Sequence, residues 1–312
     1  MSLRVVFMGT PEFALPTLQN IHHSAHTIVG IVTQPDRPRG RGQKLSPPPV
    51  KRYAIEQGLS PVLQPEKLKD PEFVTQLQAL EADVFVVVAF RILPEVVFTM
   101  PPKGTVNLHP SLLPKYRGAA PIHWAIINGE QTTGVTTIFI RKEIDAGNIL
   151  LQREVPIHPD DTAGTLHDRL AQIGADLVVE TLDALEAGTL SPRPQDESLA
   201  TPAPKLTREI CHIRFDQPAR RVRQWIQGLS PIPGGFAYLE GKLLKFYRAR
   251  VISEEPQSAP PGSVIKAEGA DLWIACHPGL VAVTEVQLEG RKRLSTEAFL
   301  RGHPVSVGTI LR

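Results

Sequence analysis

The chain has 312 residues, of which 42% are hydrophobic and 21% charged, and its formal net charge is +2. These values are ordinary for a soluble globular protein. The two cysteines are too few for a disulfide framework and have no CxxC or histidine spacing for zinc. No apolar run approaches the roughly 18 residues that span a bilayer, and the first residues do not resemble a signal or transit peptide. We therefore expect a cytoplasmic protein of two domains, with no metal and no membrane association.

The first ninety residues alternate apolar strands with helical stretches. Residues 3–9 and 27–33 are short apolar runs, and residues 82–90 (ADVFVVVAF) are so rich in β-branched side chains that both faces of this strand should be buried. This alternation implies right-handed crossovers, so we expect an α/β fold with a Rossmann-like, doubly wound, mostly parallel sheet. A dinucleotide site is not expected, because Pro11 stands where a nicotinamide fold needs its second glycine.

A basic loop at residues 34–51 interrupts this rhythm. It is rich in Gly and Pro, and its only acid is Asp36, against Arg37, Arg39, Arg41, Lys44 and Lys51. Such a composition cannot pack as a core element. Two interpretations stay open at this point, an arm that contacts the phosphates of a nucleic acid and a solvated insertion.

The chain changes character after residue 189. Residues 190–206, called here the proline-rich segment, have little apolar content and are typical of a semi-rigid linker. Beyond them, short strands follow at close intervals, with a hairpin signal at Glu240-Gly241, which predicts a small OB-like β-barrel. We thus expect domains at residues 1–189 and 207–312. Residues 206–312 carry 15 Lys and Arg against 10 Asp and Glu. This excess fits a polyanionic partner or a solvated basic face.

Short polar side chains follow two strands in the middle of the chain. The strand at residues 104–108 delivers Asn107 and His109, and Asp145 follows the strand at residues 135–140. Ligands of open α/β sheets bind at the carboxyl ends of strands. An amide and an imidazole can donate to the oxyanion of a tetrahedral intermediate, and a carboxylate can help to remove the proton of an attacking amine. The three residues together predict acyl transfer by direct attack of a substrate amine.

The nearby Ser111 has no Gly-x-Ser-x-Gly elbow. We interpret it as a turn residue or a ligand contact and not as a nucleophile. Asp161 and Thr162 can cap a helix that continues to Leu185.

Several motifs resemble a known family. Residues 107–114 (NLHPSLLP), residues 116–122 (YRGAAPI) and an Ile-Asp-Ala-Gly turn at residues 144–147 resemble the formyltransferases that use N10-formyltetrahydrofolate. Residues 7–14 (FMGTPEFA) and 33–38 (TQPDRP), with a PKLT sequence at residues 204–207, are similar to the members of this family that formylate methionyl-tRNA. The resemblance covers essentially the whole chain.

The resemblance implies roles for individual residues. Asn107, His109 and Asp145 match the catalytic residues of the family, and 10-formyltetrahydrofolate would be the formyl donor. The residues implied to bind this folate are Phe90, Arg91, Ile92, Leu93, Ser111, Leu112, Leu113, Pro114, Ile140 and Glu143. The residues implied to contact the acceptor end of initiator methionyl-tRNA are Arg37, Arg39, Arg41 and Lys44. A monomer without a metal is expected, in which the C-terminal barrel grips the tRNA.

Three alternative functions are each compatible with part of the sequence. The first is a formyltransferase for a small amine, such as glycinamide ribonucleotide or an amino sugar nucleotide, which would need neither the basic loop nor the second domain. The second is a tRNA-binding homologue without activity, motivated by Glu143, which replaces a glycine common in the family. It does not account for the joint presence of Asn107, His109 and Asp145. A nicotinamide dehydrogenase lacks the glycines that it needs.

Overall fold

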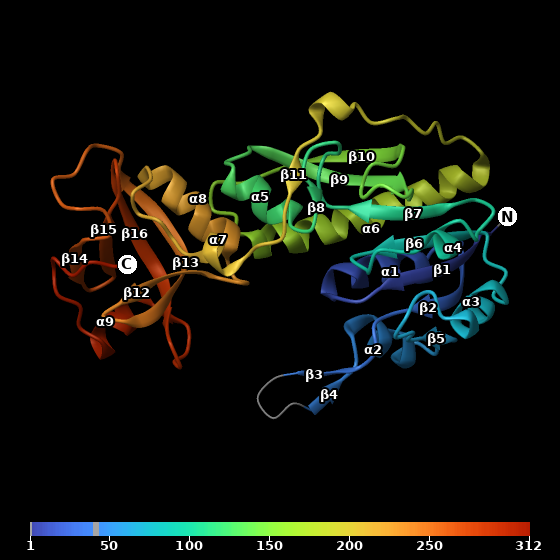
Figure 1. Cartoon of the computed structure of the whole chain (residues 1–312), viewed down its shortest axis with the longest axis horizontal. Coiled ribbons are helices and arrows are strands. Elements are labelled where there is room, and N and C mark those ends of the chain that lie inside the picture. Colours follow the sequence, from blue (N-terminus) through green and yellow to red (C-terminus); the bar gives the residue numbers. More distant parts are fainter. Residues whose placement is uncertain (1, 40–43) are drawn as a thin grey trace. The chain divides into compact units, whose positions relative to one another are not determined.

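The computed structural model of the chain describes residues 2–39 and 44–312 (Figure 1). Contacts divide the chain into two compact units. The first comprises Met1–Gly118, Thr132–Pro156 and His167–Pro202, and the second comprises Ala119–Gln131, Ile157–Leu166 and Ala203–Arg312. None of the helices among the described residues is long and apolar enough to cross a membrane.

The first unit is built on a seven-stranded sheet with the order β10-β9-β7-β6-β1-β2-β5. Strands β1, β2, β5, β6 and β7 are parallel, whereas β9 is antiparallel to β7 and to β10. The predicted doubly wound, mostly parallel sheet is therefore confirmed. The strands are β1 (Arg4–Gly9), β2 (Thr27–Val32), β5 (Val62–Leu63), β6 (Val84–Val88), β7 (Thr105–His109), β9 (Thr132–Phe139) and β10 (Ile149–Pro156).

Helices cover both faces of this sheet (Figure 1). On one face, Phe85 and Val87 of β6 share a buried cluster with Phe73 of α3 (Pro71–Gln78) and Val97 of α4 (Glu95–Phe98). On the other face, α6 (Ala163–Ala187) packs so closely against β7 that a Cβ on Gly174 would lie 2.7 Å from a methyl group of Leu108. Every residue of β6 is buried, as its β-branched composition predicts.

The helices begin at recognisable sequence signals. The Asp70 side chain accepts a hydrogen bond from Glu72 N at the start of α3, and Thr162 accepts one from Thr165 N (3.2 Å) at the start of α6, which confirms the predicted cap. The other helical elements before the proline-rich segment are η1 (Glu12–Ala14), α1 (Leu15–His22), α2 (Pro49–Glu56) and α5 (Pro121–Ile127).

The second unit contains an antiparallel sheet with the strand order β12-β13-β16-β15-β14, with β17 paired to β16. Glu240 and Gly241, between β12 and β13, both have positive φ values (50° and 79°), as the predicted two-residue hairpin turn requires. The strands are β12 (Gly235–Leu239), β13 (Lys242–Ser253), β14 (Val264–Glu268), β15 (Asp271–Ala275), β16 (Leu280–Leu288) and β17 (Leu294–Ser295). The helices of this part of the chain are α7 (Arg208–Cys211), α8 (Ala219–Leu229) and α9 (Thr296–Gly302).

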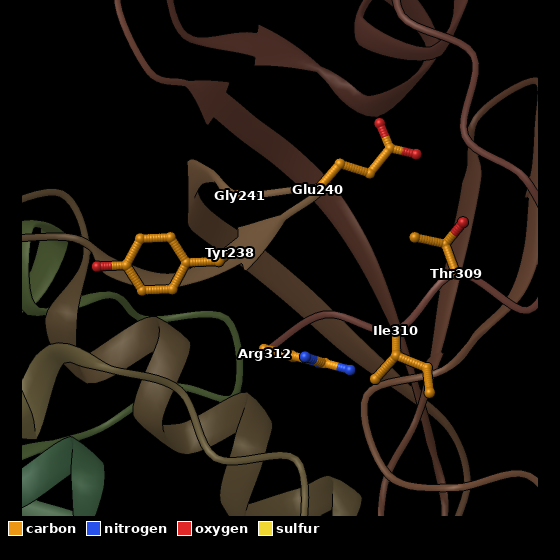
Figure 2. Close-up of a pocket in the computed structure, with 6 residues that line it drawn as sticks. All are labelled: Tyr238, Glu240, Gly241, Thr309, Ile310 and Arg312. Atoms are coloured by element: carbon orange, nitrogen blue, oxygen red, sulfur yellow. The ribbon is translucent and has the colours of Figure 1, made fainter.

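The last residues of the chain connect the two edges of this sheet. Tyr238 of β12 exchanges two backbone hydrogen bonds with Arg312, and Val264 of β14 donates from its N–H to Thr309 O (2.8 Å). Among the described residues β12 and β14 do not pair with each other, so the predicted barrel is not closed by strand pairing. A pocket of about 560 Å³ lies at this junction, lined by Tyr238, Glu240, Gly241, Thr309, Ile310 and Arg312 (Figure 2).

Candidate active site

Strand β7 positions Asn107 and His109. Because side chains alternate along a strand, the two residues point to the same face of the sheet. That face is also the one occupied by Val87, which pairs with Asn107 in the register of β6 and β7. Among the residues that the structure describes, the Asn107 amide has no side-chain hydrogen bond, so its N–H groups are available to a ligand.

The hydrogen bonds of His109 fix which of its nitrogens faces the site. The ring is buried, with 4% of its surface exposed, and Nε2 lies 2.9 Å from the carbonyl oxygen of Tyr116. A carbonyl oxygen can only accept, so Nε2 carries the hydrogen and donates it. Nδ1 is therefore the nitrogen that faces the carboxylate of Asp145, at 3.6 Å from Oδ2.

Asp145 reaches His109 by an indirect route. Strand β9 is antiparallel to β7, so its carboxyl end at Phe139 lies beside Val106 and not beside His109. The loop of residues 140–148 folds back from this end and brings the Asp145 carboxylate to the imidazole. At the end of the loop, a Cβ on Gly147 would lie 1.6 Å from the carbonyl oxygen of Phe139, so only glycine fits there.

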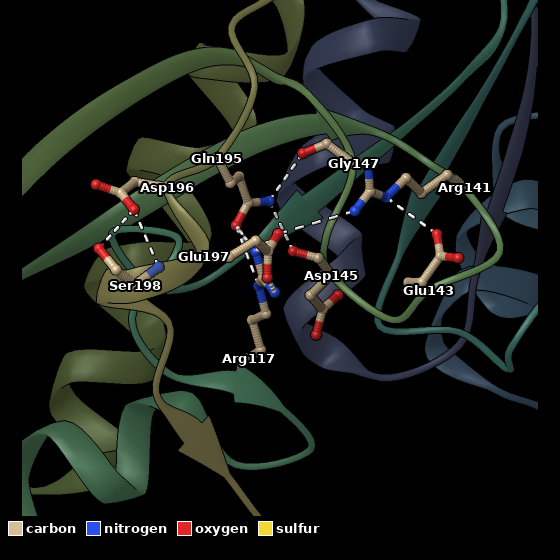
Figure 3. A network of polar contacts seen from close by, with 9 residues as sticks. All are labelled: Arg117, Arg141, Glu143, Asp145, Gly147, Gln195, Asp196, Glu197 and Ser198. Atoms are coloured by element: carbon tan, nitrogen blue, oxygen red, sulfur yellow. Dashed lines mark hydrogen bonds and ion pairs between the residues drawn. The ribbon is translucent and has the colours of Figure 1, made fainter.

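The carboxylate and the backbone of Asp145 are both held by hydrogen bonds. Oδ2 accepts a bond from the N–H of Gly118 (2.9 Å). The residue has a φ of +51°, in the left-handed region that few residues other than glycine adopt. Its carbonyl oxygen accepts a bond from Nε2 of Gln195 (2.7 Å), a residue of the proline-rich segment (Figure 3). Such strained residues are often found at functional sites, where surrounding contacts maintain them.

The turn that follows β7 is internally hydrogen-bonded. Ser111 is fully buried, and its hydroxyl donates to Lys115 O (2.6 Å). Thr136 of the neighbouring β9 donates to Ser111 O and accepts from Leu113 N, so the turn is fixed to the sheet. Leu112 packs against Gly134, where a Cβ would lie 2.5 Å from its methyl group. The Ser111 hydroxyl thus stabilises the turn. Pro114, in the same turn, is half-buried.

The segment from Phe90 to Leu93 divides into anchored and exposed residues. The Arg91 guanidinium lies over the Phe90 ring and donates to the carbonyl oxygens of Glu66 (3.0 Å) and Pro65 (2.8 Å). Its burial lowers the pKa of Arg91. Leu93 is part of the buried cluster with Val87, whereas the Ile92 side chain is 75% exposed.

The loop residues Ile140 and Glu143 have different surroundings. Ile140 is half-buried and packs against the same buried cluster as Phe90. Glu143 is exposed and forms an ion pair with Arg141 (3.1 Å). Figure 3 shows the Glu143 side chain beside the Arg141 guanidinium.

The basic loop forms a short hairpin in which β3 (Arg37–Arg39) pairs with β4 (Lys44–Ser46) (Figure 1). At its base, Asp36 accepts hydrogen bonds from Lys51 (2.8 Å) and Gln64 (2.9 Å), and these bonds lower the pKa of Asp36. The only acid of the loop is thus neutralised by Lys51. Arg37 is exposed, and Arg41 lies outside the described residues.

Two residues of the proline-rich segment were not anticipated from the sequence. Gln195 contacts the Asp145 loop, and the Thr201 hydroxyl accepts a hydrogen bond from the N–H of Tyr116 (2.9 Å), the residue whose carbonyl holds His109. No local sequence pattern marks them, because their partners lie 50 and 85 residues away. Within the described part of the chain, no cluster of three His, Cys, Asp or Glu residues is arranged to hold a metal ion.

Known proteins match this chain over nearly its whole length. Residues 3–182 match the family model of formyl transferases, and residues 205–304 match that of the formyl transferase C-terminal domain. The methionyl-tRNA formyltransferase of Caldanaerobacter subterraneus subsp. tengcongensis is 46% identical over 99% of this chain and 100% of its own length. That of Pelotomaculum thermopropionicum is 47% identical over 99% of this chain and 98% of its own length.

A solved structure is similar in fold. HypX from Aquifex aeolicus in complex with tetrahydrofolic acid superimposes with a TM-score of 0.67 and 18% identity, over 100% of this chain and 51% of HypX. Because relatives nearly half identical match from end to end and both domain models are present, the chain belongs to the methionyl-tRNA formyltransferase family.

Proposed function

We propose that the chain transfers the formyl group of 10-formyltetrahydrofolate to the α-amino group of the methionine on initiator methionyl-tRNA, for translation initiation. The observation that carries this proposal is the His109–Asp145 pair, 3.6 Å apart, on the sheet face to which Asn107 also points. His109 and Asn107 can donate hydrogen bonds to an oxyanion, and Asp145 can accept the proton of an amine. The arrangement of these three residues therefore suits attack by an amine.

His109 and Asn107 are the donors in this mechanism. Since Nε2 of His109 donates to Tyr116 O, the ring presents Nδ1 to the substrate. In the proposed mechanism Nδ1 carries a second proton, so the ring is an imidazolium, which the carboxylate of Asp145 stabilises. Its Nδ1–H donates a hydrogen bond to the formyl oxygen as that oxygen becomes negative. The Asn107 amide supplies a second hydrogen bond to the oxyanion.

Asp145 handles the proton of the attacking amine. The amine nitrogen forms a bond to the formyl carbon, and the tetrahedral intermediate then loses N10 of the folate as its bond to that carbon breaks. The proton leaves the amine for the Asp145 carboxylate, directly or through a water, and is returned to N10. The products are formylmethionyl-tRNA and tetrahydrofolate, with no covalent enzyme intermediate.

The remaining site residues are proposed to hold the two substrates. The half-buried Phe90 and Ile140 offer an apolar margin for the flat pterin ring, next to the backbone of Arg91, Ile92 and Leu93. The turn of residues 111–114 and the loop bearing Glu143 are proposed to flank the pterin ring. The exposed Arg37, with Arg39, Arg41 and Lys44 of the same basic stretch of sequence, is proposed to contact phosphates at the acceptor end of the tRNA. We infer that the enzyme acts as a cytoplasmic monomer.

An acceptor competition tests this proposal. Purified enzyme is given 10-formyltetrahydrofolate with initiator methionyl-tRNA, glycinamide ribonucleotide or an amino sugar nucleotide, and formylated product is measured for each. Formylation of the methionyl-tRNA alone supports the proposal. Efficient formylation of a small amine in its place assigns a different acceptor, and transfer to none of the three contradicts the proposed activity.

A further inference from the structure

We propose that the proline-rich segment is part of the catalytic apparatus, because Gln195 and Thr201 position Asp145 and His109. This inference rests on the catalytic roles proposed for the latter two residues. The composition of this segment predicts only a linker, and the inference gives the segment a role in catalysis. Gln195 and Thr201 are positioning residues here, since each acts through another residue and neither touches the catalytic side chains themselves.

Gln195 links the backbone of the Asp145 loop to the Arg117 side chain. Its Nε2 donates to the carbonyl oxygens of Asp145 (2.7 Å) and Gly147 (2.8 Å), so both amide hydrogens are used on the loop. Its Oε1 accepts two bonds from the Arg117 guanidinium, at 2.7 and 3.1 Å. Figure 3 shows the Gln195 side chain between Arg117 and the loop. All four hydrogen bonds therefore depend on one amide.

Arg117 completes the connection to the carboxylate. It precedes Gly118, whose N–H donates to Asp145 Oδ2. Gln195 thus holds the backbone of Asp145 directly. It also holds Arg117, the residue that precedes the Gly118 N–H donor of the carboxylate. Because Asp145 has a φ of +51°, its conformation needs such contacts to persist. Loss of the Gln195 amide hydrogens should let the loop relax and carry the carboxylate away from His109.

Thr201 acts in the same way on His109. Its hydroxyl accepts a hydrogen bond from Tyr116 N (2.9 Å), and its carbonyl oxygen accepts one from Arg117 N (2.8 Å). Tyr116 in turn presents the carbonyl oxygen that binds Nε2 of His109, and its own φ is +63°. The proline-rich segment therefore supports both partners of the His109–Asp145 pair.

Gln195→Glu is the most informative substitution. A glutamate at this position keeps the length of the side chain and its bonds to Arg117, now as an ion pair, so the fold should keep its melting temperature. It cannot donate to the carbonyl oxygens of Asp145 and Gly147, which it repels. We expect kcat for formyl transfer to fall by about 10-fold or more, with KM for both substrates little changed. Gln195→Met, which is similar in length and has no donor, replaces it in the same test should the glutamate variant not fold.

The experiment compares Gln195→Glu, Asp145→Asn and the double variant in single-turnover formylation of methionyl-tRNA. Ser198→Ala is the matched control, because Ser198 lies in the same segment and, within the part of the chain that the structure describes, its hydroxyl bonds only to Asp196. The proposal predicts slow single variants, a normal control, and a double variant no slower than Asp145→Asn, because Gln195 acts through Asp145. Thr201→Val should also be slow, and Thr201→Ser, which retains the hydroxyl, should restore the rate.

The outcomes separate this inference from the proposed function. Normal turnover of Gln195→Glu beside a slow Asp145→Asn overturns the positioning role and leaves the proposed function intact. Losses that multiply in the double variant overturn it too, since Gln195 then acts independently of Asp145. Normal turnover of Asp145→Asn itself contradicts the proposed mechanism, and the inference falls with it.

Discussion

Nε2 of His109 donates a hydrogen bond to the carbonyl oxygen of Tyr116 over 2.9 Å, which leaves Nδ1 as the only ring nitrogen able to face the Asp145 carboxylate. This relationship determines which part of the imidazole takes part in the chemistry. It also separates the structural role of the ring, at Nε2, from its proposed catalytic role, at Nδ1.

Two amide substitutions of His109 distinguish these roles. The amide nitrogen of an asparagine lies near the position of Nδ1, and that of a glutamine lies near Nε2. His109→Asn should therefore keep a donor toward the substrate, whereas His109→Gln should keep only the bond to Tyr116. We expect His109→Gln and His109→Ala to lower kcat by about 100-fold or more and His109→Asn by clearly less. Steady-state kinetics measure this, with substitution of the exposed His158 by alanine as a control of normal rate. Equal loss in the two amide variants would contradict the assignment of Nδ1.

Gly147→Ala tests the backward course of the Asp145 loop. A Cβ there would lie 1.6 Å from Phe139 O, so the loop has to move away from the end of β9. We expect a fall in kcat together with a loss of roughly 1–3 kcal/mol in the free energy of unfolding, typical of an overpacked site. Gly302→Ala is the matched control, since a Cβ on Gly302 meets no atom within 4 Å. Denaturant titration measures the free energy of unfolding, and steady-state kinetics measure kcat. If both values for Gly147→Ala equal those of this control, the packing argument is refuted.

Arg37→Ala tests the basic hairpin. Arg37 is exposed on β3, and the Asp36–Lys51 ion pair at its base leaves its charge uncompensated within the loop. We expect a higher KM for methionyl-tRNA and an unchanged KM for 10-formyltetrahydrofolate. The slope of log affinity against log salt should decrease by about one for a lost phosphate contact. Lys103→Ala removes an exposed cation elsewhere in the first unit and should change neither. A rise of both KM values for Arg37→Ala would instead indicate that the hairpin supports the fold.

The two thiols should be unreactive in the native protein. Cys276 is 2% exposed, and burial raises its pKa to about 12; burial also raises the pKa of Cys211. A raised pKa means that the reactive thiolate is scarce at pH 8 and increases only as the pH approaches that value. We expect a disulfide reagent to modify neither cysteine at pH 8 until denaturant unfolds the second unit. Rapid labelling of native protein would show that this core opens far more often than its packing implies.

Much of the fold could be predicted because its signals are local. The β-branched composition of residues 82–90 predicted a strand buried on both faces, which residues 84–88 form. The Glu240-Gly241 pair predicted a hairpin turn, and both residues have positive φ values. Asn107 and His109 were recognisable because they lie two residues apart at the carboxyl end of a short apolar strand. In each case, neighbouring residues carry the information.

The approach of Asp145 to His109 could not be predicted in the same way. The expectation that strand ends meet applies to parallel strands, whereas β9 is antiparallel to β7 and its carboxyl end lies beside Val106. The loop returns to His109 because Gly147 allows a close contact and Gln195 holds the backbone. Composition describes how apolar the proline-rich segment is, but not which distant carbonyl groups its side chains bind.

Asp145→Asn tests the central claim most directly. An asparagine has nearly the same shape and can still accept the Gly118 hydrogen bond through its amide oxygen, but it cannot take up the proton of the attacking amine. With both substrates saturating and enzyme in excess, single-turnover formylation of methionyl-tRNA should slow by about 100-fold or more, while tRNA affinity is retained. A rate within a few-fold of the unmodified enzyme would contradict the account.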